Sequence, residues 1–260
     1  MERLRYVARS GGVDAATIVA ETVEAIARLR PGASELVPLC RNLVERNPTC
    51  GPLWWLCAHL LAAPRDLEPA WRLADEIDGD PTPARLADRL PDDAVVMTVG
   101  CPPIAAQALR RAGNVSVLAV LAGDDGRALV RAMDRAGVEV EPVAPEAMLS
   151  GLRGADLVLV EADACSAESV VASVASGLAA IAASALDMPV WLVAGRGRRL
   201  PVPYVDAIGR SLPADAEIFS TQYVTKVVGP QGVAPMSREA LAGECPLIPE
   251  LGVAVPGDRD

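Results

Sequence analysis

The strongest constraint on the fold is a short run of apolar residues that does not alternate with polar ones. Leu157, Val158, Leu159 and Val160 follow one another directly, after the sequence Gly-Ala-Asp. A strand with one face in water alternates apolar and polar residues, whereas a strand covered by helices on both faces is apolar throughout. The run therefore predicts a buried strand of a parallel sheet.

The same rhythm of strand and helix recurs from residue 94 onward. Candidate strands lie at Ala94–Val99, Val115–Leu121, Val138–Pro142, Leu157–Val160 and Val190–Val193, and helical stretches lie between them at Ile104–Ala112, Gly126–Ala136, Pro145–Leu152 and Glu168–Leu186. Strands that alternate with helices indicate a parallel sheet with right-handed crossovers. We expect two further short strands within residues 216–228. The Pro- and Gly-rich residues after 230 are expected to pack as an extended arm or to be partly disordered.

The first 90 residues have the spacing of helices. Apolar residues recur at helical intervals in Val13–Leu29, Ser34–Arg46, Leu53–Ala63 and from Leu67 to Ile77. The third segment is apolar on all sides, so we expect it to lie between the others. The sequence thus predicts a helical N-terminal domain at residues 1–90. An α/β domain with a C-terminal arm is predicted at residues 91–260, joined to the first by the Pro-rich stretch GDPTPARLADRLPDD.

Composition narrows the range of functions. The net charge of −10 and pI of about 4.7 argue against general binding to nucleic acid or to an anionic membrane. No apolar run approaches the roughly 18 to 20 residues that cross a bilayer, and the N-terminus does not resemble a secretory signal, so we expect a cytoplasmic protein. The six cysteines form no Cys-x-x-Cys pair and His59 is the single histidine, so we expect no metal site and no cofactor.

Two carboxylates follow the buried strand. In open α/β sheets, ligands bind in the crevice beyond the carboxyl ends of the strands. Glu161 and Asp163 lie where the strand ends, so these two carboxylates are candidates for binding a ligand or for chemistry. A solvated turn in which Asp163 caps the next helix is the alternative.

Two other strand ends carry candidate residues. Gly100 and Cys101 follow the first strand and precede a helix, whose N-terminal N–H groups favour a thiolate or a bound anion. Pro102 and Pro103 weaken this site because they lack N–H donors. Arg196 and Arg198, with Arg199, lie in a glycine-containing loop after the fifth strand, and this loop is either a clamp for phosphate or carboxylate or an ordinary solvated loop.

Several segments resemble one protein family in their order and spacing. They are VVMTVGCPPIAAQALRRA, GADLVLVEADA, SALDMPVWLVA and QYVTKVVGPQGVAP, within about residues 90 to 235. The chain resembles the alpha, beta and delta regulatory subunits of translation initiation factor 2B, whose relatives include the methylthioribose-1-phosphate and ribose-1,5-bisphosphate isomerases. The resemblance implies a helical N-terminal domain followed by a Rossmann-like domain of the ribose-5-phosphate isomerase and CoA-transferase type, which forms a homodimer.

The resemblance also implies a catalytic pair. In the isomerases the pair is a cysteine after the first strand and an aspartate that matches Asp163, although Glu161 stands where the isomerases have glycine. Cys101 is one place later than the isomerase cysteine, which aligns with Gly100. Three further polar motifs of the family differ: one is shortened to GDDG at residues 123–126, one reads Ala172-Ser173-Val174-Ala175-Ser176, and an arginine of the alpha subunit is replaced by Pro103.

Because so many polar motifs differ, we expect a binding protein with little or no catalysis. Its ligand would be a phosphorylated sugar or nucleotide at the strand ends, or it would serve as a subunit of an assembly. The alternative is a diverged aldose–ketose isomerase of a ribose or methylthioribose phosphate, in which Cys101 and Asp163 transfer protons and the arginine loop anchors the phosphate. A scaffold whose pocket is filled by side chains is a third possibility.

Overall fold

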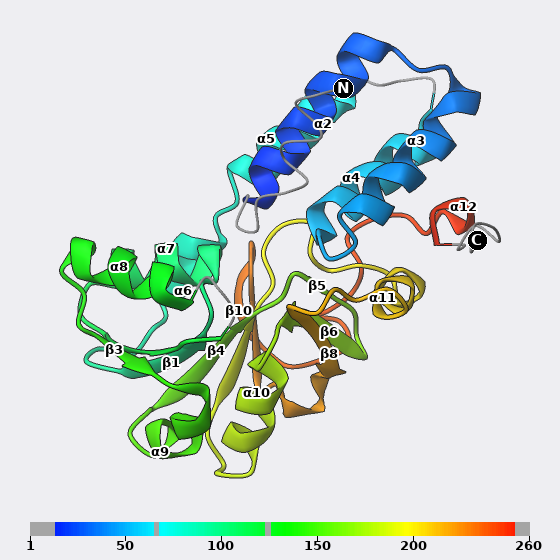
Figure 1. Ribbon diagram of the computed structural model, residues 1–260. Helices are drawn as coiled ribbons and strands as arrows, with labels where there is room; N and C mark the ends of the chain where they lie inside the picture. Colours follow the sequence, from blue (N-terminus) through cyan, green and yellow to red (C-terminus); the bar gives the residue numbers. More distant parts are fainter. Residues whose placement is uncertain (1–13, 65–67, 123–125, 253–260) are drawn as a thin grey trace.

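A computed structural model describes residues 14–64, 68–122 and 126–252 of the chain. Helices of the N-terminal part stand above a sheet that has helices on both of its faces (Figure 1). The predicted fold class, an N-terminal group of helices followed by an α/β part, is confirmed.

The four predicted N-terminal helices are present. They are α2 (Ala15–Leu29), α3 (Ala33–Arg46), α4 (Gly51–Ala62) and α5 (Pro69–Asp78); the predicted starts at Val13 and Leu67 lie outside the described residues. A further helix, α6 (Thr82–Ala87), forms within the stretch predicted as a linker. Asp80 supports its start, since its Oδ1 accepts hydrogen bonds from the Thr82 N–H (2.9 Å) and hydroxyl (2.5 Å). Helix α6 packs against α7 and the sheet, although it lies before residue 90. The domain boundary near residue 90 therefore stays a prediction.

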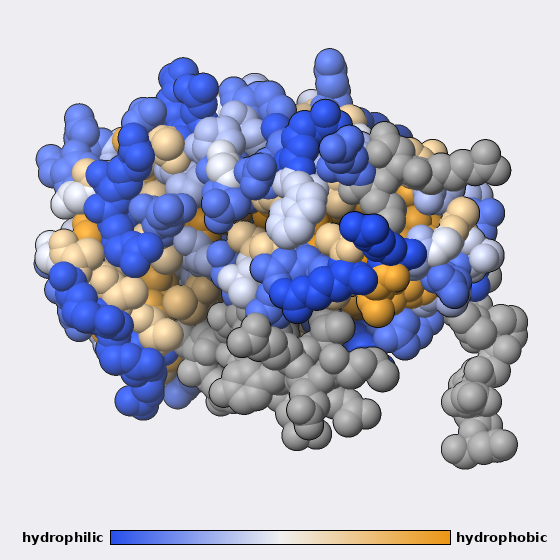
Figure 2. Space-filling view, turned by 90° about the horizontal axis from the view of Figure 1, so that it is seen from above, coloured by the Kyte–Doolittle hydropathy of each residue, from blue (hydrophilic) through white to orange (hydrophobic). Residues whose placement is uncertain are grey.

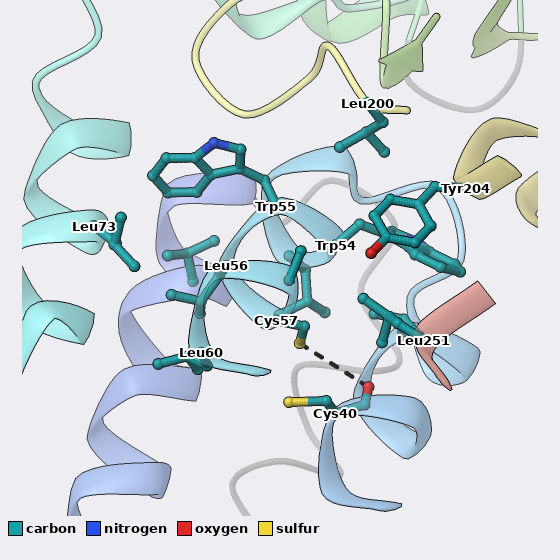
Figure 3. Close-up of a cluster of buried hydrophobic side chains, with 14 of the residues drawn as sticks. Cys40, Trp54, Trp55, Leu56, Cys57, Leu60, Leu73, Leu200, Tyr204 and Leu251 are labelled. Atoms are coloured by element: carbon teal, nitrogen blue, oxygen red, sulfur yellow. Dashed lines mark hydrogen bonds between the residues drawn. The ribbon is translucent and has the colours of Figure 1, made fainter. Parts of the chain in front are cut away.

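Helix α4 is buried, as its apolar sequence predicts. Figure 3 shows its side chains packed between Leu73 of α5 and residues from the later part of the chain. Trp54 lies 5.5 Å from Tyr204, measured between ring centroids, and Leu251 belongs to the same cluster. The helical part is thus docked on the α/β part through a shared hydrophobic core. Neither α4 nor another helix of the described chain is long and apolar enough to cross a membrane.

The described strands form a seven-stranded sheet in the order β10-β9-β7-β4-β1-β2-β3. Neighbouring strands are parallel except for the antiparallel pair β9 and β10, so the sheet is mixed. The strands are β1 (Val95–Val99), β2 (Ser116–Val120), β3 (Val140–Val143), β4 (Leu157–Glu161), β7 (Val190–Val193), β9 (Lys226–Gly229) and β10 (Gly232–Pro235). The five predicted strands are confirmed, and β4 is buried along its whole length.

Two layers of helices cover the sheet. Helices α7 (Pro103–Ala112) and α8 (Gly126–Ala136) pack on one face together with α6, and α9 (Met148–Leu152) and α10 (Ser176–Ser184) pack on the other. The strand order reverses between β1 and β4, which is where ligands bind in open α/β sheets. The remaining helices are η1 (Pro145–Ala147), α11 (Val202–Gly209), η2 (Thr221–Tyr223) and α12 (Pro249–Gly252).

The prediction of one long helix over Glu168–Leu186 was wrong in its first half. Residues Ser169–Ser173 form strand β6, which pairs with β5 (Ala164–Cys165) and β8 (Ala216–Ser220) in a second sheet. The β-branched Val170 and Val171 are buried in this strand, where such side chains pack well. Ala175, with a φ of 73°, turns the chain into α10. Within the stretch predicted as one helix, only α10 is helical, and it begins at Ser176.

Candidate functional site

A cavity of about 360 Å³ lies between the N-terminal helices and the carboxyl edge of the sheet. Small-molecule sites have volumes of about 300 to 1,000 Å³, so this cavity has room for a small ligand. Its charged lining consists of Arg110, Arg196 and Arg198 together with Asp14, Asp78 and Asp80. The cavity therefore combines three guanidinium groups with three carboxylates at the place where the fold predicts a ligand.

The loop after β7 brings two of these arginines to the cavity. Asp80 holds this loop, since its Oδ2 accepts a hydrogen bond from the backbone N–H of Arg196 at 2.8 Å. Gly195 makes the approach possible, because a Cβ there would collide with the side chains of Asp80 and Ile104. Gly197, with a φ of +76°, packs against Pro52 of α4. The glycines of this loop thus permit close contact with the helical part.

Glu161 lies at the N-terminus of α7. Its Oε2 accepts a hydrogen bond from the backbone N–H of Ala105 (2.9 Å), and its Oε1 lies 3.0 Å from Nη1 of Arg198. Both side chains are buried, with 4% of Glu161 and 7% of Arg198 exposed. The sequence predicted a bound anion or thiolate at this helix end. In the structure the carboxylate of Glu161 occupies this helix end, and the helix dipole stabilises its negative charge.

Burial changes the ionisation of this cluster. Desolvation raises the pKa of Glu161 to about 7, although Arg198 and the Ala105 N–H act in the opposite direction. Desolvation also raises the pKa of Asp163 to about 6; Arg198 opposes this shift and Asp215 adds to it. Burial lowers the pKa of Arg198, but Glu161 and Asp163 more than offset this effect, so its pKa is raised. Burial thus raises the pKa of both carboxyl groups, and the Arg198 guanidinium opposes the rise in each case.

Asp163 is fixed by its backbone at the contact between the two parts of the chain. Its N–H donates to the Val171 carbonyl (2.8 Å), and its carbonyl accepts from the Gly51 N–H (3.1 Å). The residue is half-buried and, like Cys101, is not among the described residues that line the cavity. Cys101 is also half-buried and packs against the hydrophobic cluster beneath α7.

Gly100 adopts the turn that its position after β1 requires. It has a φ of +67°, and its N–H donates to the Val120 carbonyl at 3.0 Å. A Cβ at this position would contact the hydroxyl of Ser173 at 3.5 Å. Ser173 in turn lies 3.2 Å from Ser176, measured between the hydroxyl oxygens. The turn therefore faces the serines that replace the family's polar motif. The motif at Gly123–Asp125 lies outside the described residues.

The three arginines of the predicted clamp have different environments. Arg198 is paired with Glu161, and Arg196 lies 3.6 Å from Glu244, measured from Nη1 to Oε1. Arg199 donates to Gln231 (3.0 Å) and to the Ala240 carbonyl (3.1 Å), and it also pairs with Glu244. Arg199 therefore holds the C-terminal arm, and Arg196 and Arg198 are the two that line the cavity.

Sequence reasoning missed the contribution of α7 and of the residues before β1. Gln107 and Arg110 line the cavity together with Pro103, and these three residues share one face of α7 at positions i, i+4 and i+7. That spacing was a signal in the sequence, but only the docking of the helical part on this face makes it a cavity wall. The described residues contain no group of His, Cys, Asp and Glu side chains suited to a metal ion.

Solved structures of initiation factor 2B proteins superpose on the chain over most of its length. The translation initiation factor eIF-2B of Pyrococcus horikoshii OT3 gives a TM-score of 0.78 at 18% identity, covering 92% of this chain and 98% of that one. The corresponding values for eIF2B beta of Chaetomium thermophilum are 0.70 and 15%, over 99% and 94%. A chain of the tetrameric eIF2B-beta2-delta2 complex of C. thermophilum gives 0.72 and 16%, over 92% and 91%.

The chain has the initiation factor 2B fold. No protein-family model matches the sequence, and no curated protein matches it. The resemblance inferred from short sequence segments is thus confirmed at the level of the fold. Because many functions can occur on one fold, the function has to be argued from the cavity and its residues.

Proposed function

We propose that this chain is an initiation-factor-2B-like binding protein, acting in the cytoplasm, that takes a phosphorylated sugar or nucleotide with little or no catalysis. The observation that carries the proposal is the cavity of about 360 Å³ at the carboxyl edge, with Arg110, Arg196 and Arg198 in its wall. Guanidinium groups match phosphate oxygens in geometry and charge, and Arg110 and Arg196 would hold the phosphate because Arg198 is already paired with Glu161. The carboxylates Asp14 and Asp78 at the same cavity are suitable acceptors for ligand hydroxyl groups.

Three features support binding over catalysis. The carboxylate of Glu161 is engaged by Arg198 and by the N-terminus of α7. Neither Cys101 nor Asp163 is among the cavity-lining residues in the described chain. The serine-containing segment Ala172–Ser176 lacks the amide and ammonium groups of the isomerase motif. The groups that would transfer protons are therefore set apart from the groups that would hold the phosphate.

The alternative, a diverged aldose–ketose isomerase, is favoured by one observation. Burial raises the pKa of Asp163 to about 6, which is close to the value that suits a general acid or base at neutral pH. In this hypothesis Asp163 and Cys101 would exchange protons with a ribose or methylthioribose phosphate. Closure of the strand ends around the ligand would have to bring both residues to it.

A ligand screen separates these two functions. Purified protein is heated with ribose phosphates, methylthioribose 1-phosphate and nucleoside monophosphates, and each ligand that raises the melting temperature is followed by phosphorus NMR. We expect stabilisation without new phosphate resonances. New resonances that disappear in Asp163→Asn would support the isomerase instead. If no ligand of the panel shifted the melting temperature, the binding proposal would be wrong for this ligand class.

We also propose that the α/β part forms a homodimer. Leu149 of α9 and Leu178 and Ile181 of α10 are exposed by 53%, 56% and 43%. Helix α10 has no charged residue, and its other face is already buried against the sheet. A helix that is apolar on all sides is typical of a buried position. A second copy of the chain that covers α9 and α10 would supply the missing contact.

The dimer is tested by measuring the mass in solution by light scattering after size exclusion. We expect twice the chain mass for the wild type and the chain mass for Leu178→Glu. The matched control is Leu29→Glu, because Leu29 is equally apolar and 65% exposed but belongs to α2 of the helical part. A monomeric wild type would remove the proposal, as would a Leu178→Glu variant that remained dimeric.

A further inference from the structure

Helices α7 and α8 form a basic surface on a chain whose net charge is −10. The two helices carry five arginines and one carboxylate, which are Arg110, Arg111, Arg127, Arg131, Arg135 and Asp134. They lie at the left of Figure 1, and the same end of the molecule presents strongly hydrophilic residues in Figure 2. The charge of these two helices is opposite to that of the whole chain.

Three of the arginines form a stripe along α8. Arg127, Arg131 and Arg135 are exposed at positions i, i+4 and i+8, opposite the buried Leu129 and Met133. Consecutive members of the stripe are about 6 Å apart along the helix axis, from a rise of about 1.5 Å per residue. The helix thus turns its apolar residues toward the sheet and a row of like charges toward the solvent.

The fold does not explain this stripe. Like charges at i and i+4 destabilise a helix, and Arg127 in the first turn also opposes the helix dipole. Across the described chain, none of the three forms an ion pair; the local contact of Arg135 is from its Nε to the Arg131 carbonyl, at 2.9 Å. Charges that weaken the helix and form no ion pair with another described residue indicate a function outside the chain.

We infer that the stripe of Arg127, Arg131 and Arg135 docks an acidic helical segment of a partner protein. Carboxylates at i, i+4 and i+8 of a helix have the same spacing of about 6 Å, so an antiparallel or parallel acidic helix would face all three guanidinium groups at once. A nucleic acid fits less well, because neither α7 nor α8 carries an aromatic side chain for stacking and the remaining surface is acidic. A short acidic segment of a protein would contact only the three arginines of the stripe.

The inference is tested by fluorescence anisotropy with a labelled, alanine-based peptide of about 20 residues that has Glu at i, i+4 and i+8. An isomeric peptide has the three Glu residues adjacent. We expect the spaced peptide to bind with an affinity that falls as salt is raised, and to bind about tenfold more weakly to the variant Arg127→Gln/Arg131→Gln/Arg135→Gln. The matched control, Arg46→Gln/Arg72→Gln/Arg153→Gln, removes three exposed arginines elsewhere and should change the affinity by less than about twofold.

Three results would overturn the inference. The first is equal binding of the spaced and the isomeric peptide, which would show that charge alone and not the spacing is recognised. The second is no loss of affinity in the α8 variant, or no binding of either peptide to the wild type. The third is tighter binding of a single-stranded RNA of similar length through the same arginines, which would assign the surface to nucleic acid. Circular dichroism of each variant verifies that α8 remains folded.

Discussion

Arg198 and Arg110 line the same cavity but differ in almost every physical respect. Arg198 is buried, lies 3.0 Å from Glu161 and donates to the Ala162 carbonyl at 2.5 Å. Arg110 is exposed on the last turn of α7, and the described residues give it no ion pair. A charged side chain at the carboxyl edge of a sheet is therefore not a ligand-binding group by its position alone. Its burial and its partners decide whether it serves the fold or a ligand.

The buried pair has to be present as a whole. A buried ion pair gives little net stability compared with apolar residues, but removal of one partner leaves an uncompensated charge in a medium of low polarity. Glu161 also accepts a hydrogen bond at the N-terminus of α7, so it stays buried when Arg198 is removed. Loss of Arg198 therefore leaves a buried carboxylate without its guanidinium partner. An exposed arginine such as Arg110 can be removed without this penalty.

The largest effect is expected for Arg198→Met. Loss of the guanidinium should lower the free energy of unfolding by about 3 to 5 kcal/mol, measured by urea denaturation at pH 8, because Glu161 remains buried and unpaired. Arg110→Met is the matched control and should change the same quantity by less than about 0.5 kcal/mol. The double variant Glu161→Leu/Arg198→Met should recover much of the loss. Equal stability of the two single variants would show that Arg198 supports the fold no more than Arg110 does.

The second prediction concerns the pH dependence of stability. The pKa of Glu161 is raised to about 7 in the folded chain, so the folded state binds more protons than the unfolded state between about pH 4 and 7. Stability from this group is therefore complete at low pH and is lost as the pH rises through 7, by about 2 to 4 kcal/mol. Urea denaturation at several pH values should show a smaller loss in Glu161→Gln. A variant with an unchanged slope would assign the pH dependence to other groups.

The apolar runs predicted most of the fold because their physical cause is local. Leu157–Val160 could be recognised as a buried strand without knowledge of its neighbours, and the helical spacing of the N-terminal part was equally direct. The error over Glu168–Leu186 had a different origin. Ser169–Ser173 is a strand because β5 and β8 pair with it, and β8 lies more than forty residues further along the chain. A pairing of that kind leaves little trace in a local window.

The sequence pointed to the strand ends beside the candidate site, but not to the side chains that pair with each other there. The rule for strand ends led to Glu161 and to the loop of Arg196 and Arg198. Glu161 caps α7 and pairs with Arg198. Both contacts depend on the directions of side chains that follow three different strands, and no short stretch of sequence determines these directions. Arg110 was missed because its role depends on how the N-terminal helices dock above α7.

The third prediction concerns Arg110, the exposed arginine of the cavity. Arg110→Gln should weaken binding of the phosphorylated ligand found in the screen by about tenfold, as expected for one lost charge-assisted hydrogen bond. Arg111→Gln is the matched control, because Arg111 is the adjacent exposed arginine of α7 and is not among the cavity-lining residues described. Isothermal titration calorimetry gives both dissociation constants. Similar constants for the two variants would remove Arg110 from the proposed site.

A small effect on stability is expected for Arg196→Gln, because the burial of Arg196 lies between that of Arg198 and that of Arg110. Its side chain is 27% exposed and its carboxylate partners Glu244 and Glu76 are 3.6 and 4.0 Å away, distances at which a partly exposed pair contributes less than about 1 kcal/mol. The loop itself is held through the backbone N–H of Arg196 and Asp80, a contact that the substitution retains. The variant should therefore unfold almost as the wild type does and yet bind the phosphorylated ligand more weakly. If urea denaturation showed a loss as large as that of Arg198→Met, Arg196 would belong to the structural group of arginines and the binding group would reduce to Arg110.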